Sequence, residues 1–474
     1  MRVFSVFENI GFLFVSDVIS RLLSFGLFLA IANTLGKSGL GDYSLIFAFV
    51  GLLVVFNDLG IQVLFVRDVA KNLARTSYIL KNTLSMKVLL GLIVAFLTAV
   101  AVNFTNVSAE VVLSVYIVAL ATFFFSLKTM FLAVFYAHER MLFVAFATML
   151  EMFLAVVLGV SAIISGYGLV GLSFAFLMSY FVVFVVSIVA VRRLTTISFG
   201  FNLDFQKRFL RSSLPFWFSG LLMAIYFRID TVMISLIKGS AETGLYNASY
   251  RLLDALYFIP SAVIGAVFPA MSRLHVKNKN VLRSLYRKSF YYLLAIALPM
   301  GVGVTMLAER LTLFIFGSGF SGTHLALQIL IWALVAIFLS SLTGFLMNAV
   351  NKQLLFTLTT AFAALLNVAL NLFFIPLWSY IGAAISTVMT EFFVLILLVY
   401  FARKNSYAFD MFRTLLKPVA ATAFMAVVIF ALLNFHIMLI VPVAATAYFV
   451  MLFLIGGLEK EEFHLLKGYL KRIF

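Results

Sequence analysis

The chain has 474 residues, of which 64% are hydrophobic and only 11% are charged, with a mean hydropathy of +1.14. Soluble domains have about 45–50% apolar and about 25% charged residues, so this composition indicates an integral membrane protein. The complete absence of cysteine excludes disulfides, thiolate catalysis and cysteine-ligated metals.

Apolar segments long enough to cross a bilayer as helices follow one another along the chain. They number about fourteen and lie near 8–33, 41–66, 83–102, 111–136, 142–165, 169–191, 214–238, 245–271, 289–308, 324–350, 354–375, 381–402, 416–434 and 437–456. None has the alternation that transmembrane β-strands require. We therefore predict an all-α membrane protein with about fourteen transmembrane helices.

The formal net charge of +16 is distributed along the chain in a way that favours a membrane over a nucleic acid. Most Lys and Arg lie near the termini and in alternate loops, at 67–87, 138–141, 192–211, 273–288, 351–353 and 403–417. The loops between these hold only Lys37, Lys238 and Arg310. This is the pattern of the positive-inside rule, so we expect a multi-pass protein of the cell membrane with both termini in the cytoplasm and no nucleic-acid partner.

The sequence contains an internal repeat. "LGKSGLGDYS" follows the first span and "IKGSAETGLYNA" follows the seventh, and three residues match at one constant spacing. The matched pairs are Gly36 with Gly239, Gly41 with Gly244, and Tyr43 with Tyr246. We therefore predict two parallel six-helix lobes, at 1–191 and 214–402, joined by a cytoplasmic linker at 192–213. Two further helices at 403–456 and an amphipathic cytoplasmic tail at 457–474 complete the chain.

Ionisable residues inside the predicted spans are the strongest functional signal, because such groups face a bundle interior or a watery cavity. Asp17 and Arg21 are four residues apart, so they can pair on one helix face. The pair Arg251 and Asp254, three residues apart, can do the same. Arg228 and Asp230 are two apart and point to nearly opposite sides of their helix, so each needs its own partner.

Asp230 lies at a membrane depth similar to that expected for three polar residues, Asn367, Asn371 and Thr387. One carboxylate with amide and hydroxyl oxygens is a plausible shell for a small hard cation such as Na⁺. A proton taken up by Asp230 alone would do similar coupling work. Alternatively, these side chains only bridge helices by hydrogen bonds.

Four basic residues, Arg21, Lys128, Arg228 and Arg251, suggest a lining that receives an anionic, phosphate-bearing substrate, because the planar guanidinium binds phosphate bidentately. Acidic residues in the spans outnumber them, so the net charge of the cavity cannot be read from the sequence. Neutralised pairs needed only for folding are the alternative interpretation.

The stretches "FRIDTVMIS" and "GSAETGLYNASYRL", with "LGKSGLGDYSLIFAF" near the N-terminus, resemble the polysaccharide transporter family. These are the O-unit flippases of the multidrug/oligosaccharidyl-lipid/polysaccharide (MOP) superfamily. The resemblance implies a V-shaped pair of six-helix lobes. It also implies alternating-access flipping of polyprenyl-diphosphate-linked oligosaccharides from the cytoplasmic to the outer leaflet.

Lipid II flippases of this superfamily have a sodium site that Asp230, Asn367, Asn371 and Thr387 resemble. Asn371 departs from that pattern, which has a second aspartate, and leaves the coupling ion open. Asp17 resembles a coupling aspartate of the drug exporters, although Arg21 can neutralise it.

The nearest alternative is a cation-coupled drug or metabolite exporter on the same fold. A membrane enzyme is disfavoured by the short outward loops and the absence of paired loop carboxylates, so we expect no enzymatic activity. No cofactor is expected besides Na⁺. The expected partners are a lipid-linked oligosaccharide, membrane lipids and a glycan polymerase or glycosyltransferase, with the protein itself a monomer.

Overall fold

The computed structural model describes residues 6–457, and all regular structure in this range is helical. Twelve of the described helical stretches are long and apolar enough to cross a membrane, which confirms the predicted all-α membrane fold. The tail predicted at 457–474 lies outside the described residues, apart from its first residue.

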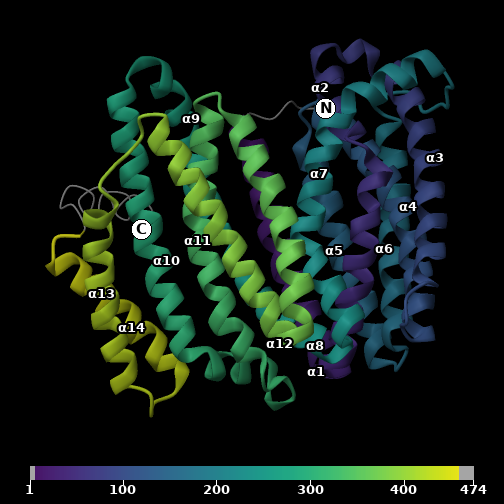
Figure 1. The fold of residues 1–474 in the computed structure, drawn as a ribbon. Helices are drawn as coiled ribbons and strands as arrows, with labels where there is room; N and C mark the ends of the chain where they lie inside the picture. The colour runs from purple at the N-terminus through teal and green to yellow at the C-terminus, as the bar shows by residue number, and fades with distance from the viewer. Residues whose placement is uncertain (1–5, 458–474) are drawn as a thin grey trace. The chain divides into compact units, whose positions relative to one another are not determined.

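The predicted count of about fourteen spans depends on two long helices, α1 (Val6–Asp58) and α12 (Gln353–Lys404). Each is more than twice the length of about 20 residues that one crossing needs. Each also contains one non-helical residue, Gly36 (φ 64°) in α1 and Ser379 (φ 55°) in α12. In Figure 1 the purple α1 runs away from its start and then returns toward α2. Fourteen apolar runs therefore appear as twelve continuous helical stretches, and the count of fourteen stays a prediction.

The chain forms two compact units, one of residues 1–247 with 371–380 and the other of residues 248–370 with 381–474. This division differs from the predicted lobes, 1–191 and 214–402. The reason is that α7 (Leu203–Lys238) packs against α1 and α2 and so joins the first unit. The predicted lobe boundaries stay a prediction.

The first unit is built on α1 to α7 and the start of α8. Its remaining helices are α2 (Ile61–Lys71), η1 (Leu73–Arg75), α3 (Thr76–Val102), α4 (Ala109–Ala137), α5 (Met141–Ile164), α6 (Gly168–Val191) and α8 (Ser240–Asp254). A buried cluster joins α2, α3 and α4, with Phe65, Leu80 and Phe131 at most 2% exposed. α4 lies between α3 and α6 in the packing order of this unit.

The second unit contains α9 to α14, with the Asn371–Tyr380 segment of α12 excluded. Its helices are α9 (Phe258–Lys277), α10 (Lys279–Phe316), η2 (Ser318–Phe320), α11 (Thr323–Ala349), α13 (Met411–Ala431) and α14 (Ile437–Leu454). α11 packs against α9 and α10 and is the most buried of the candidate spans. A separate cluster around Ala421, Ile440 and Tyr448 joins α10, α13 and α14.

The backbone supports the internal repeat. Gly36 and Gly239 both adopt positive φ angles, 64° and 91°, with ψ near 180°. A side chain at such angles is strained, so glycine is favoured at both positions. The first and seventh predicted spans thus end in the same turn.

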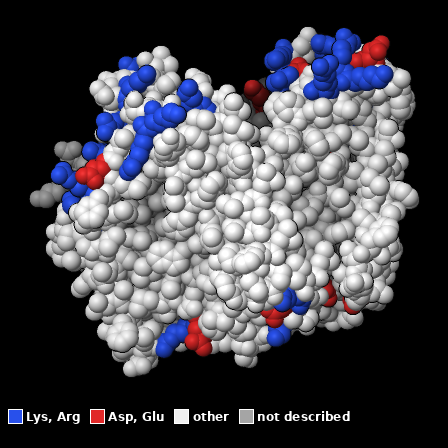
Figure 2. Space-filling model, in the orientation of Figure 1, with Lys and Arg blue, Asp and Glu red and all other residues white. Residues whose placement is uncertain are grey.

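Charged side chains lie mostly at the helix ends. Figure 2 shows Lys and Arg gathered there on the face in view, with a broad uncharged band between. One basic residue was placed wrongly by the sequence: Lys87 is not the end of a loop. α3 already begins at Thr76, so Lys87 lies inside this helix and is 1% exposed.

Candidate functional site

Arg228 of α7 lies against the backbone of α1. Its Nη1 donates a hydrogen bond to the carbonyl oxygen of Phe47 over 2.9 Å. Gly51, one turn further along α1, makes room for the guanidinium, because a Cβ there would lie 2.5 Å from Nη1. The side chain is exposed, and among the described residues its hydrogen-bond partner is this neutral carbonyl rather than a carboxylate. Arg228 is therefore a fixed cation that keeps its charge available.

Two of the other predicted basic residues are paired with acids in the first unit. Lys128 of α4 forms an ion pair with Glu151 of α5 and is only 4% exposed. Its ammonium also lies 4.3 Å from the ring centroid of Phe125. Arg21 pairs with Asp17 over 2.8 Å on an exposed face of α1, as the spacing predicted.

Arg251 and Asp254 lie in the last turn of α8, in the second unit. The structure brings neither of them together with Arg228, Arg21 or Lys128 within one unit. Their predicted role stays a prediction.

Asp230 is the buried acid of the site and is 6% exposed. One carboxylate oxygen accepts a hydrogen bond from the Tyr246 hydroxyl over 2.7 Å. The other accepts from the Asn371 amide nitrogen over 2.6 Å. Beside this group, the Thr231 hydroxyl donates to Asn247 Oδ1 over 3.2 Å. The structure therefore brings Asp230 and Asn371 into direct contact, and their predicted role in binding a cation stays a prediction.

The other two members of the predicted sodium shell belong to the second unit. Asn367 is 3% exposed, and Thr387 is 9% exposed and donates to the carbonyl of Ala383 over 2.9 Å. Within the first unit, Asp230 and Asn371 lie together and carry carboxylate and amide oxygens, the ligand types that a small hard cation prefers. Asn371 presents its nitrogen to Asp230, so it would have to turn its amide to contribute an oxygen.

The two repeats meet at Gly41 and its match, Gly244. A Cβ on Gly41 would overlap the carbonyl oxygen of Ser240, and a Cβ on Gly244 would overlap the carbonyl oxygen of Lys37. The Ser240 hydroxyl also donates to the carboxylate of Asp42. Because Gly41 matches Gly244 and Lys37 matches Ser240, each repeat presents the same surface to the other.

Residues from the Asn371–Tyr380 segment secure this end of the first unit. Lys238, at the end of α7, donates to the carbonyl of Pro376 over 2.8 Å. Ser379, the non-helical residue of α12, donates to Glu242 over 2.7 Å. The segment that carries Asn371 is thus tied to α7 and α8 at three points, counting Asp230.

Sequence reasoning missed several participants. Tyr246 was identified only as a repeat match, and its bond to Asp230, which lies on the preceding helix, was not foreseen. Nothing in the sequence around Gly51 indicates that an arginine from α7 packs against it. The ion pair between the buried Lys87 and the partly exposed Asp58, with 2.6 Å between Nζ and Oδ1, was missed because Lys87 was counted with the loop at 67–87.

Two family models match overlapping parts of the chain. The model described as polysaccharide biosynthesis protein matches residues 6–275. The model of the lipid II flippase MurJ matches residues 192–457. Each covers more than half of the chain, and together they cover nearly all of it.

Individual relatives share about a quarter or less of their residues with this chain over the compared regions. The chain is 25% identical over 262 residues to a protein of Haloferax volcanii named probable flippase AglR, a match that covers 53% of this chain and 55% of AglR. The chain therefore aligns with only about half the length of this curated relative. Among solved structures, the fold is similar to the inward closed conformation of the lipid II flippase MurJ, with a TM-score of 0.79 and 16% identity. That likeness covers 92% of this chain and 97% of MurJ.

The fold is also similar to an inward-facing multidrug resistance MATE family transporter of the MOP superfamily. The TM-score is 0.63 and the identity 18%, over 81% of this chain and 94% of the transporter. At these identities the structural likeness establishes the fold. The family matches go further: this chain belongs to the polysaccharide biosynthesis protein family of the MOP superfamily, and its C-terminal part also matches the superfamily's lipid II flippases.

Proposed function

We propose that the protein flips a polyprenyl-diphosphate-linked oligosaccharide from the cytoplasmic to the outer leaflet by alternating access. The proposal is carried by Arg228, an exposed cation on an apolar helix that contacts a neutral carbonyl instead of a carboxylate. A charge at mid-membrane costs about 2.5–3.5 kcal/mol on insertion scales, so an unneutralised arginine there needs a compensating function. The diphosphate of the cargo supplies the missing negative charge.

The contrast with the other basic residues of the first unit supports this role. Arg21 and Lys128 have acidic partners, Asp17 and Glu151, so their charge is largely satisfied before any substrate arrives. Arg228 keeps a guanidinium fork positioned by Phe47 and Gly51. A planar fork can bind two phosphate oxygens at once, which an ammonium cannot do.

Alternating access is supported by the reciprocal glycine contact and by family membership. The contact at Gly41 and Gly244 brings the backbones of the two repeats together, with the bond from the Ser240 hydroxyl to Asp42 beside it. Rocking of one repeat against the other about such a close contact opens the opposite end, as in transporters built from repeats. The headgroup crosses through the polar interior while the polyprenyl chain stays in lipid.

We infer further that a cation couples to transport at Asp230. The carboxylate is buried and is held by two donors, Tyr246 and Asn371. A proton or Na⁺ bound there removes the negative charge and releases these bonds. The helix α7 therefore has two states, one with the ion bound at Asp230 and one with Asp230 bonded to Tyr246 and Asn371.

A cation-coupled drug exporter is the second candidate, favoured by the likeness to the MATE transporter and by Asp17 in the first predicted span. The ion pair between Asp17 and Arg21 weighs against it, because the acid is neutralised within its own helix.

The test compares Arg228→Ala with Arg310→Ala in a flipping assay and an expression assay. Arg310 is a matched control, because it is partly exposed and also donates an exposed hydrogen bond to a backbone carbonyl, that of Phe435, over 2.9 Å. We expect Arg228→Ala to reduce flipping about tenfold or more at normal membrane insertion, from the loss of a charge-assisted bond of about 1.5–3 kcal/mol. Arg310→Ala should leave flipping unchanged.

Equal loss of flipping and membrane insertion in Arg228→Ala would show that Arg228 is needed for folding and not for substrate binding. Native mass spectrometry of the protein purified from its own host identifies the cargo directly. A retained polyprenyl diphosphate with sugars supports the flippase. Export of amphipathic cations that is unaffected by Arg228→Ala would favour the exporter.

A further inference from the structure

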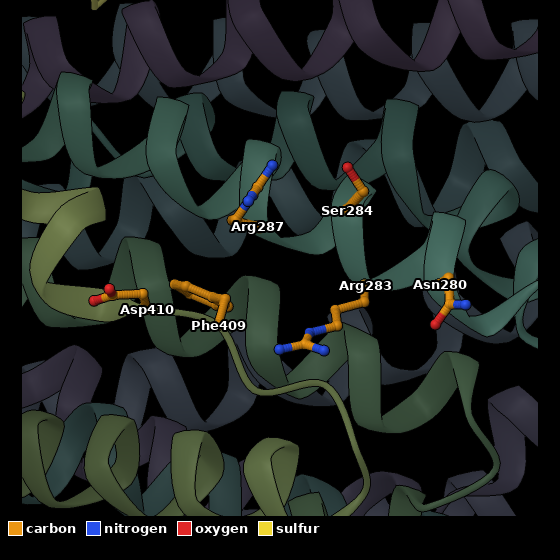
Figure 3. A pocket seen from close by; sticks show the side chains of 6 residues that line it. All are labelled: Asn280, Arg283, Ser284, Arg287, Phe409 and Asp410. Carbon is orange, nitrogen blue, oxygen red and sulfur yellow. The ribbon is translucent and has the colours of Figure 1, made fainter.

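A pocket of about 300 Å³ opens at the start of α10, within the second unit. Its lining comprises Asn280, Arg283, Ser284 and Arg287 of α10, with Phe409 and Asp410 of the α12–α13 connection. Figure 3 shows Arg287 and Ser284 above Arg283 and Asn280, with Phe409 and Asp410 to one side of them. Arg283 extends its guanidinium into the space between the two groups. Pockets that bind small ligands start at about this volume.

The walls of the pocket are held in place by buried aromatic packing. The lining residues of α10 share one face at helical spacing, and the opposite face is buried, with Leu282 and Tyr286 at most 1% exposed. The Phe409 ring lies 5.4 Å from the ring of Tyr286 and 5.1 Å from that of Phe290. These contacts fix the connection against α10, so the pocket is formed before a ligand binds.

A second contact anchors the same connection. Tyr407, two residues before Phe409, is 3% exposed, and its hydroxyl lies 3.0 Å from Nδ1 of His275. The pocket wall is therefore attached to both α9 and α10.

The charges of the pocket favour an anion. Asp410 caps α13 by accepting from the backbone N–H of Arg413 over 3.1 Å, and its other oxygen lies 3.2 Å from Nε of Arg413. Its negative charge is thus offset outside the pocket. Arg283 and Arg287 form no ion pair among the described residues. Two guanidinium groups, with Ser284 and Asn280 as further donors, can bind a negatively charged group in the pocket.

The position of the pocket along α10 identifies the source of that group. The lining residues of α10 fall within "NVLRSLYR", and the apolar run of the same membrane-crossing helix begins after Lys288, at "SFYYLLAIALPM". The pocket therefore lies at the end of the span, at the depth of lipid headgroups. We propose that it binds the phosphate of an acidic membrane lipid, with Arg283 and Arg287 holding the phosphate oxygens and Phe409 packing beside the glycerol.

This site is separate from Arg228 and Asp230 and does not depend on the proposed transport function. The test titrates the full-length protein in detergent with phosphatidylglycerol or phosphatidylcholine and counts bound lipid by native mass spectrometry. The test variant is Arg283→Gln with Arg287→Gln. The matched control, Arg192→Gln with Arg193→Gln, removes the same charge from an exposed pair at the end of α6.

We expect the protein to prefer phosphatidylglycerol and the test variant to bind it about tenfold more weakly, with phosphatidylcholine unaffected. The control should keep the preference. Arg283→Lys with Arg287→Lys, which retains charge but loses the guanidinium fork, should fall between the two. The preference should also weaken as salt is raised.

Two results would overturn the proposal. Equal losses in the test and control variants would mean that only net charge attracts the lipid. Displacement of the lipid by inorganic phosphate at equal concentration would mean that the pocket recognises a free anion rather than a membrane lipid. Folding of each variant is checked by its thermal unfolding temperature, and a variant within about 2 °C of the parent is taken as folded.

Discussion

Gly41 and Gly244 each leave just enough room for the backbone of the other repeat. The contact is reciprocal: Gly41 faces Ser240 and Gly244 faces Lys37, and all four residues occupy equivalent positions in the duplicated sequence. Any side chain at either glycine overlaps a carbonyl oxygen. The close approach therefore depends on both positions remaining glycine.

We predict that Gly244→Ala destabilises the protein by about 1–3 kcal/mol, because a methyl group in a filled contact forces the backbone apart. The measurement is the thermal unfolding temperature in detergent, combined with flipping in vesicles. Gly26→Ala is the control: it lies in α1 with nothing within 4 Å of an added Cβ. A helical alanine in open space should be neutral or should stabilise by about 0.5–1 kcal/mol. Similar losses in both variants would contradict the prediction.

We predict that Asp230→Asn abolishes the part of flipping that responds to a Na⁺ or proton gradient, because an amide can neither take up a proton at neutral pH nor supply the charge that a cation needs. Flipping is measured with and without each gradient in turn. If a gradient of either ion stimulated flipping by the variant as much as by the parent, Asp230 would not be the coupling residue.

We expect Tyr246→Phe, which removes one donor from the Asp230 carboxylate, to cost about 1.5–3 kcal/mol of stability. The buried carboxylate then loses this donor, while the bond from the Asn371 amide remains. The control is Tyr116→Phe, since the Tyr116 hydroxyl makes a bond of similar length, 2.8 Å, to Asn103 but on an exposed face. Equal unfolding temperatures for the two variants would show that the bond to Asp230 stabilises the protein no more than an exposed hydrogen bond does.

We predict that Lys128→Met destabilises the protein by about 3–5 kcal/mol, since it leaves Glu151 charged and largely buried without its partner. Adding Glu151→Gln should restore most of the unfolding temperature. The flipping rate of the double variant then distinguishes two roles. A normal rate would indicate that the pair is structural. A low rate in a stable protein would indicate that Lys128 belongs to the substrate path. A single variant as stable as the parent would contradict the prediction.

The stability of the protein should depend on pH through His138, which lies just after α4 with Nε2 3.1 Å from the Thr76 hydroxyl. Burial, with a smaller effect of Arg140, lowers the pKa of His138 below its ordinary value of 6.5. The unfolded chain therefore takes up this proton at higher pH than the folded protein. Stability is lost as the pH falls through 6.5 toward the lower folded pKa.

We expect His138→Gln to lose less stability than the parent between pH 7.5 and pH 5.5. The measurement is the difference in unfolding temperature between parent and variant at each pH. A difference that stays constant across this range would show that His138 does not titrate differently in the folded state.

Much of the architecture follows from patterns that are local in sequence. Apolar runs determine the spans, and the Asp17–Arg21 pair follows directly from helical spacing. The repeat was visible because Gly36 and Gly239 are required by the same positive-φ turn. Asp230 was recognisable because a buried carboxylate in a membrane helix needs a partner.

The remaining features depend on which helices become neighbours, which the sequence does not state. Arg228 finds its place only because α7 crosses α1 at Gly51, a glycine with no local role. Lys87 was misassigned because a lysine beside an apolar run is usually a loop residue; Asp58 on another helix stabilises its burial. Tyr246 reaches Asp230 because α8 turns back beside α7 after Gly239.

The reciprocal contact has a consequence for the origin of the chain. Position 37 meets position 244 and position 240 meets position 41, which is the pattern of a symmetric homodimer. A half-length ancestor with one copy of this surface would make the same contact between two identical subunits. Fusion of the two genes would then preserve an existing interface, and the glycine it requires would have been selected once, before the duplication.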